Sequence, residues 1–296
     1  MTEVELTVVI PAHNAAATLA AQLDALGAQE WDGRWEIVLV DNLSTDATVA
    51  IALEYGTHDA RLRVVEARDQ PRIGHARNTG ITAARGRSIA MCDSDDVVGA
   101  GWVAAIGNAL RAHEFVAGAL DVHTLNAAEL VATRGRAIER EQATFQGVFP
   151  VAHSCNMAFR RDVVTRIGGF AEDLVNGSDV DFSHRAFRAG IVCHYEPAAV
   201  VAYRYRATNR ALFRQARNYG KVNAQLVAKF RAAGTHVEFA NDWKGWVFLA
   251  RRLPSLTSPS GRANWAWSAG TRVGRAEGRW RHRQALRESR RWGFQR

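Results

Sequence analysis

Short apolar runs rich in β-branched residues alternate, over the first hundred positions, with stretches in which apolar residues recur every three or four positions. The runs predict buried strands and the spaced stretches predict helices. Strands are predicted at 6–10, 36–40, 62–65 and 88–92. Helices are predicted after Asn14, after Asp46 and over 74–84. This alternation is typical of a parallel sheet covered on both faces by helices.

The pattern is less regular in the second hundred residues. A helix and then a strand are predicted within 102–122, whereas 123–150 has weak periodicity and is predicted to form a mobile loop region. Ordered structure is predicted again from 154–160 onwards. A helix over 179–189, strands at 191–195 and 198–205, and a long basic helix over 209–230 are predicted to follow. Beyond Gly234 the chain is rich in tryptophan and arginine.

Composition narrows the class of protein. The 296 residues are 47% hydrophobic and 23% charged, which is typical of a globular chain and excludes a disordered one. The three cysteines are far apart and favour neither a disulfide framework nor a zinc site. The amino terminus is acidic, unlike a signal peptide, and no apolar stretch approaches the roughly 20 residues of a membrane span. We therefore expect a cytoplasmic protein that does not cross a membrane.

Charge divides the chain into two unlike parts. Residues 201–296 contain 21 of the 38 Lys and Arg residues but four of the 30 acidic residues, a net charge of +17, whereas residues 1–200 carry −9. This asymmetry indicates an acidic binding or catalytic body joined to a basic surface that suits anionic partners.

Polar residues follow three of the predicted strands. They are Pro11-Ala-His-Asn14, Asp41-Asn42 and Asp93-Ser-Asp-Asp96. In a parallel sheet these strand ends line one crevice, where ligands bind. Asp93 and Asp95 are two residues apart, and such oxygen ligands suit Mg²⁺ or Mn²⁺ held together with substrate phosphates. An isolated Asp-x-Asp more often caps a turn, but its place after a buried strand, beside two companion strand ends, favours a binding site.

Four segments together resemble a family 2 glycosyltransferase with the GT-A fold: 6–26, 37–49, 74–96 and 155–190. The resemblance implies a Rossmann-like α/β nucleotide-diphospho-sugar transferase fold, with a mixed, mainly parallel sheet flanked by helices. We expect a GT-A domain over 1–205, with a nucleotide-sugar half (1–100) and an acceptor half (101–205). A basic, mostly helical extension is expected over 206–296.

The resemblance also implies roles for individual residues on the donor side. The nucleotide base and ribose are expected near Pro11, His13, Asn14 and Asp41. Within His75-Ala-Arg-Asn-Thr-Gly80 the resemblance places Arg77 near the nucleotide; the alternative is a solvent-facing arginine with a glycine needed for packing. Asp93 is expected towards the ribose, and Asp95 towards the metal and diphosphate.

On the acceptor side, the resemblance makes Asp179 the general base. Ser178 stands where the family usually has glutamate. A base is required because the acceptor hydroxyl must lose a proton as it attacks the anomeric carbon, and direct displacement opposite the diphosphate inverts that centre. The alternative for Asp179, and more so for Asp181, is an acid favoured by the helix dipole.

Three further residues have two interpretations each. Many relatives carry a histidine near position 204, where this chain has Tyr203-Arg-Tyr-Arg206. Arg204 or Arg206 is expected to contact the diphosphate, since guanidinium matches phosphate oxygens, or else to be an exposed strand residue. His153 is expected to touch the acceptor or to be a loop residue. The histidine with which such relatives can contact the metal or the diphosphate is absent near position 204.

The extension contains six of the nine tryptophans. Its aromatic and basic residues are interpreted, in decreasing order of preference, as packing on the body or a second copy, binding to an anionic membrane surface at its inner face, or binding to nucleic acid. Nucleic acid ranks last because no recognition motif is present.

The predicted function is an inverting glycosyltransferase that moves a sugar from a nucleotide-diphosphate donor, with a UDP-sugar favoured, to a hydroxyl acceptor. The acceptor is a glycan, a lipid-linked molecule or a small molecule, and the cofactor is Mg²⁺ or Mn²⁺. The alternative is a catalytically inactive GT-A scaffold that binds nucleotide. A nucleotidyltransferase ranks lower, since the chain lacks a glycine-rich amino-terminal loop to cradle a triphosphate.

Overall fold

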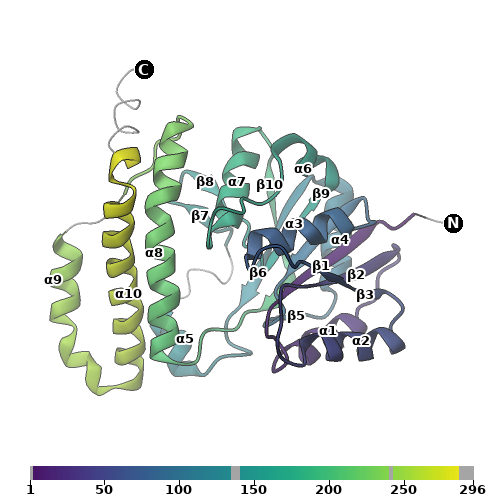
Figure 1. The fold of residues 1–296 in the computed structure, drawn as a ribbon, viewed down its shortest axis with the longest axis horizontal. Coiled ribbons are helices and arrows are strands. Elements are labelled where there is room, and N and C mark those ends of the chain that lie inside the picture. The colour runs from purple at the N-terminus through teal and green to yellow at the C-terminus, as the bar shows by residue number, and fades with distance from the viewer. Residues whose placement is uncertain (1–2, 135–140, 240–242, 287–296) are drawn as a thin grey trace.

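The computed structural model describes residues 3–134, 141–239 and 243–286. In this part of the chain an eight-stranded mixed sheet lies at the centre, in the order β3-β2-β1-β4-β9-β6-β10-β5 (Figure 1). Its strands are β1 (Leu6–Ala12), β2 (Trp35–Asp41), β3 (Leu62–Glu66), β4 (Ser88–Cys92), β5 (Val97–Val98), β6 (Phe115–Asp121), β9 (Asn156–Arg160) and β10 (Cys193–Ala202). The first four are parallel to one another, while β9 is antiparallel to both of its neighbours, β4 and β6.

Helices cover both faces of the sheet, as the alternating pattern predicts. They are α1 (Leu19–Gly27), α2 (Thr48–His58), α3 (Ile73–Ala83), α4 (Trp102–Ala112), α6 (Arg161–Ile167) and α7 (Ser178–Arg188). Leu6, Val8 and Ile10 of β1 pack with apolar residues of α1 and α4, whereas Val9 packs with residues of α3 and α7 on the other face. The period-two alternation of a strand thus divides the core into two layers. The expected mixed, mainly parallel α/β fold is confirmed.

The segment 123–150 is more ordered than its sequence predicts. It contains α5 (Ala128–Arg134) and a small hairpin of β7 (Thr144–Phe145) and β8 (Phe149–Pro150); 135–140 lie outside the described residues. Phe145 and Phe149 stack with ring centroids 5.3 Å apart, and both meet Phe230 edge to face. The hairpin is therefore stabilised by a residue some eighty positions away, which local periodicity does not reveal.

The two strands expected over 191–205 are one strand, β10. Its register with β6 shifts between Glu196 and Val200, around Pro197, which explains why the pattern reads as two runs. The strand ends at Ala202, so Tyr203 to Arg206 form a connection to the extension.

The extension is helical and begins with the 24-residue α8 (Asn209–Ala232). After α9 (Trp243–Arg251) and a short 3₁₀ turn (Leu253–Thr257), α10 (Pro259–Arg281) runs beside α8 (Figure 1). Val222, Leu226 and Phe230 of α8 share a hydrophobic core with Phe149 and Leu174 of the body.

Small residues make the contact between α10 and α8. Gly270, Gly274 and Gly278 face the backbone carbonyls of Phe213, Arg217 and Lys221 in turn, so close that a Cβ on any of them would collide. Because both residue numbers rise together, the two helices are parallel, and glycine is required for their backbones to approach this closely. The extension thus packs on the body through apolar residues of α8, and its own helices α8 and α10 pack on each other through glycine. Trp267 contacts Tyr219 of α8, whereas Trp243, Trp246 and Trp280 are exposed.

Among the described residues, no helix combines the length and the apolar character needed to cross a bilayer. Cys92, Cys155 and Cys193 are all buried, reduced thiols.

Candidate functional site

A pocket of about 360 Å³ lies where β4 ends, between α3, the start of α7 and α8. Four of the predicted site residues line it: Arg77, Asp93, His153 and Asp179. The structure thus brings together side chains from segments as far apart as positions 77 and 179. The pocket is at the carboxyl ends of parallel strands, where a sheet of this kind binds its ligands.

Arg77 joins the donor and acceptor motifs. Its guanidinium is buried, donating through Nη1 to Ser178 Oγ at 3.0 Å, and its Nη2 lies 3.7 Å from Asp93 Oδ1. The solvent-facing alternative for this arginine is therefore wrong. The packing role expected of Gly80 is present, because a Cβ there would strike Val9 of β1. Ser178, in the position where the family usually has an acid, accepts the hydrogen bond that fixes Arg77.

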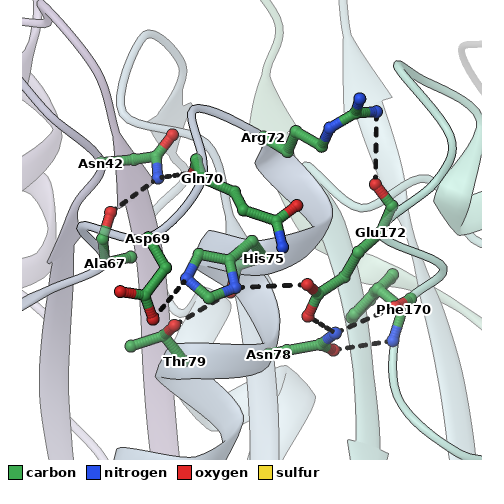
Figure 2. Close-up of polar contacts among 10 residues, drawn as sticks. All are labelled: Asn42, Ala67, Asp69, Gln70, Arg72, His75, Asn78, Thr79, Phe170 and Glu172. Atoms are coloured by element: carbon green, nitrogen blue, oxygen red, sulfur yellow. Dashed lines mark hydrogen bonds and ion pairs between the residues drawn. The ribbon is translucent and has the colours of Figure 1, made fainter.

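A polar clamp next to Arg77 fixes α3 against the loop before α7 (Figure 2). Asn78 donates to the Phe170 carbonyl at 2.9 Å and to Glu172 Oε1 at 2.6 Å, and its Oδ1 accepts from the Phe170 amide at 2.8 Å. His75 Nδ1 lies 3.2 Å from the other Glu172 oxygen. Gly169 is needed beside this clamp, since a Cβ would meet Asn78 Oδ1 at 2.5 Å. The clamp sets the position of α3 relative to the segment that leads to Asp179.

The acidic cluster at the end of β4 has unusual electrostatics. Burial raises the pKa of both Asp93 and Asp96; the Arg77 guanidinium opposes the rise at Asp93, and the neighbouring carboxylates add to it at both. Asp96 is 1% exposed, and its Oδ2 is buried without a hydrogen-bond partner. Such a concentration of buried carboxylate is costly unless a cation neutralises it.

The same cluster contains donor atoms that fit a divalent cation. One atom each from Asp93, Asp96 and Cys155 lie within 4.8 Å of one another. Burial raises the pKa of the Cys155 thiol well above its ordinary value, so this sulfur stays protonated and is a poor ligand for a hard ion. The carboxylates, including that of Asp95, are the groups that suit Mg²⁺ or Mn²⁺.

Both arginines of the connection after β10 contact the acidic cluster. Arg206 Nη1 lies 2.8 Å from Asp95 Oδ2. Arg204 donates from its backbone amide to Asp96 Oδ1 at 2.7 Å and from Nε to the Asp95 carbonyl at 2.9 Å. Neither lies in a strand, since β10 ends at Ala202; Arg204 is half-buried, whereas Arg206 is exposed. Two guanidinium groups therefore add positive charge beside the predicted diphosphate position.

Asp179 lies in the first turn of α7, after Gly177 in a left-handed conformation (φ 72°). Its Oδ2 accepts from the Ser154 amide at 3.3 Å and is 3.9 Å from His153 Nδ1. Burial alone would raise the pKa of Asp179, but His153, Arg77 and the Ser154 amide together lower it to about 2. The carboxylate is therefore ionised at neutral pH.

Asp181, the other acid of this turn, is in a different environment. It is fully buried and forms ion pairs with Arg185 and Lys229 at 2.9 and 2.5 Å. These ion pairs neutralise the charge of Asp181 within the fold, whereas Asp179 is the acid of this turn that lines the pocket.

The residues predicted at the first two strand ends form a separate network beside the pocket. Pro11 and Asp41 are buried in β1 and β2, and Asp41 Oδ1 accepts from the Ser44 amide at 3.2 Å. His13 donates from Nδ1 to the Asn42 carbonyl at 2.7 Å. Asn14, with a positive φ of 52°, accepts from the Thr45 amide at 2.8 Å. These bonds fix the two loops to each other, and His13 and Asn14 are exposed towards solvent.

Sequence reasoning missed one wall of the pocket. Tyr219, Val222, Asn223 and Leu226 of α8 line it, facing Asp179 and His153. The amphipathic spacing of this helix indicates a buried face but not what the face covers. The only sequence signal for this wall is the helical spacing of its apolar residues, which does not identify the pocket.

Comparison with known proteins places this geometry in a family. Residues 7–168, more than half of the chain, match the family model described as glycosyl transferase family 2. The chain belongs to glycosyl transferase family 2.

Two relatives indicate the breadth of this family. The glycosyltransferase AglE of Haloferax volcanii is 29% identical over 194 residues, which is 62% of this chain and 62% of AglE. The Escherichia coli UDP-Glc:alpha-D-GlcNAc-diphosphoundecaprenol beta-1,3-glucosyltransferase WfgD is 31% identical over 99 residues, or 33% of this chain and 36% of WfgD. The chain thus spans less than two thirds of the length of either relative.

Solved structures share the fold over nearly the whole chain. The mannosyltransferase PcManGT of Pyrobaculum calidifontis, in complex with GDP-Man and Mn²⁺, aligns with a TM-score of 0.64 and 21% identity, covering 95% of this chain and 88% of its own. Residues 1–349 of TarS from S. aureus, in complex with UDP-GlcNAc, align with a TM-score of 0.56 and 15% identity, covering 95% and 92%. At these identities the likeness concerns the fold, which is that of GT-A glycosyltransferases.

Proposed function

We propose that this chain is an inverting glycosyltransferase that moves a sugar from a nucleoside-diphosphate sugar to a hydroxyl acceptor. The observation that carries the proposal is the single pocket shared by Asp93, Arg77 and Asp179. Asp93 and Arg77 would hold a diphosphate and its cation, and Asp179 supplies an ionised carboxylate in the same pocket. Family membership and the fold support the reaction class.

On the donor side, the proposal assigns the nucleotide to the strand-end loops that carry His13, Asn14 and Asp41. Asp93 and Asp95 would hold Mg²⁺ or Mn²⁺, and the cation would neutralise charge on the departing diphosphate. Arg206 and Arg204 supply positive charge beside the same acids and would favour the anionic leaving group. PcManGT is described with Mn²⁺ and GDP-Man, and WfgD is named for UDP-glucose, so both nucleotides are candidates and a UDP-sugar is the first to test.

On the acceptor side, Asp179 would accept the proton of the attacking hydroxyl. The new glycosidic bond forms as the bond from the anomeric carbon to the diphosphate breaks on the opposite face, which inverts the centre. A pKa of about 2 makes Asp179 a weak base, but one that needs no prior deprotonation. His153, 3.9 Å from its Oδ2, lies where it can contact the acceptor and share the transferred proton.

The proposed acceptor site has an apolar wall made by Val222 and Leu226 of α8 together with Phe145, and two tyrosines, Tyr203 and Tyr219, also line it. Tyrosine faces suit the C–H face of a sugar ring, and the apolar wall suits an acceptor with a hydrocarbon part. A lipid-linked acceptor, as in the name of WfgD, therefore fits better than a small polar molecule. An anionic membrane surface and a second copy of the chain remain predictions for the extension.

The test compares Asp179→Asn and Asp95→Asn with Asp32→Asn, an exposed aspartate remote from the pocket. Release of nucleoside diphosphate from UDP-glucose, UDP-GlcNAc and GDP-mannose is measured with Mn²⁺ and a polyprenyl-diphosphate sugar, and binding of UDP and GDP by calorimetry. Asp179→Asn should keep nucleotide affinity and lose about 10²–10⁴-fold in turnover. Asp95→Asn should weaken Mn²⁺-dependent nucleotide binding, and Asp32→Asn should change neither.

Full turnover in both pocket variants would refute the assignment. Nucleotide binding by the wild type without turnover of any donor would favour the scaffold alternative instead.

A further inference from the structure

Exposed apolar side chains are concentrated in α9 and the turn after it. Between positions 243 and 253, the exposed fractions are 71% for Trp243, 42% for Trp246, 37% for Val247, 45% for Phe248 and 51% for Leu253. Exposed large apolar residues of the body, such as Leu53 and Val192, occur singly along the chain. A concentration of this kind on a protein surface marks an interaction site.

The exposed residues form one stripe along α9. Trp243, Trp246, Val247 and Ala250 recur at the three- and four-residue spacing of one helical face, and all are exposed. The opposite side of the helix is the one that packs inwards: Leu249 is buried, and Gly245 is in contact with Arg272 of α10. The stripe therefore points away from the protein, on the helix that lies outermost beyond α10 (Figure 1).

Charge beside the stripe is of one sign. Residues 243–276 contain Lys244, Arg251, Arg252, Arg262, Arg272 and Arg275 and no acidic residue. On the helix, Lys244 and Arg251 follow Trp243 and Ala250 by one position and so flank the stripe on one side. Arg252 and Arg272 lie over the Phe248 ring, at 4.5 and 5.7 Å from its centroid.

We infer that the α9 stripe, defined as Trp243, Trp246, Val247 and Ala250, docks on the surface of an anionic lipid bilayer. Tryptophan is favoured at the boundary between headgroups and acyl chains, and Lys and Arg are attracted to anionic headgroups. A short amphipathic helix with a basic flank lies in that plane without crossing the bilayer. Symmetric pairing of two copies through this helix is disfavoured, because it would bring together two segments 201–296, each with a net charge of +17.

The experiment measures binding of the full chain to phosphatidylcholine vesicles with and without phosphatidylglycerol, by co-sedimentation. The wild type should bind the vesicles that contain phosphatidylglycerol, and less tightly as salt is raised. The variant Trp243→Ser/Trp246→Ser/Val247→Ser should bind them at least about tenfold more weakly. Lys244→Glu/Arg251→Glu should lose binding while keeping the apolar stripe.

Leu53→Ser/Val192→Ser is the matched control, since it removes two exposed apolar side chains elsewhere and should bind as the wild type. Circular dichroism and UDP titration show that each variant is folded, so the result does not depend on glycosyl transfer. Failure of the wild type to bind the anionic vesicles would overturn the inference, as would unchanged binding by the triple serine variant. A wild-type dimer that the triple variant loses would also overturn it, in favour of a second copy.

Discussion

His184 provides a sharp test of the electrostatics of this fold. It lies in α7, 3% exposed, stacked on Phe230 with ring centroids 4.0 Å apart, and its Nε2 is 2.8 Å from Thr235 Oγ1. Burial lowers the pKa of His184 from 6.5 to about 4; Arg188, Lys229 and Arg185 add to the drop, and Asp181 opposes it. The histidine therefore joins α7 to α8 in its neutral form.

The sign of the pH effect follows from the proton count. Between pH 6.5 and about 4 the unfolded chain binds a proton at His184 that the folded chain does not, so stability falls as the pH falls through this window. At 1.36 kcal/mol per pKa unit the full loss is about 3 kcal/mol, of which about 2 kcal/mol is already lost on going from pH 7 to pH 5.

The perturbation is His184→Phe, which keeps an aromatic ring against Phe230 but cannot titrate. At pH 7 the variant should be less stable than the wild type by about 1 kcal/mol, because Thr235 loses its hydrogen-bond partner. At pH 5 the order should reverse, since the wild type has lost about 2 kcal/mol that the variant keeps.

Urea unfolding, followed by tryptophan fluorescence at both pH values, measures the two differences in the free energy of unfolding. Comparing differences removes the contribution of every other titrating group. A wild-type to variant difference that is the same at pH 7 and pH 5 would refute the reasoning.

Three further changes test the site and its supports. Gly274→Val should lower the free energy of unfolding by about 3 kcal/mol, because the new side chain collides with the Arg217 carbonyl; Lys244→Val, on the exposed face of α9, is the control in a thermal melt. Asn78→Ala should lower the free energy of unfolding by about 2–3 kcal/mol, because the amide and the carbonyl of Phe170 both lose their hydrogen-bond partner. A decrease below about 0.5 kcal/mol in urea unfolding would contradict the role of the clamp. His153→Ala removes a group that lowers the pKa of Asp179, so the acid limb of the pH–rate profile should move to higher pH; an unchanged limb would show that the contact is not made in the working enzyme.

Most of the first hundred residues could be predicted from sequence because their signals are local. The apolar run at 88–92 coincides with β4, and the spacing over 74–84 coincides with α3 to within one residue. The insertion of β9 between β4 and β6 could not be predicted, because it depends on pairs such as Ala90 and Ala158, far apart in the chain.

Some residues of the candidate site could likewise be predicted from sequence, and others could not. The acids after β4 and at the start of α7 stand in motifs, and their residue types indicate their chemistry. The hydrogen bond from Arg77 to Ser178 crosses 101 positions, and Ser178 alone reads as a missing acid. The wall made by α8 is a tertiary arrangement of ordinary apolar residues, which carry no chemical signature.

Helix α8 both lines the pocket and contacts α10. Tyr219, Val222 and Leu226 of α8 line the pocket, while Gly220, one position away from Tyr219, abuts the backbone of α10 at Thr271 and Arg275. Because no side chain separates the two backbones at Gly220, a shift of α10 would displace the pocket wall that α8 forms. A surface that bound the extension and favoured such a shift would therefore change the affinity of the pocket for its ligand. Thermodynamic reciprocity would then require a ligand bound in the pocket to change affinity for that surface by the same factor.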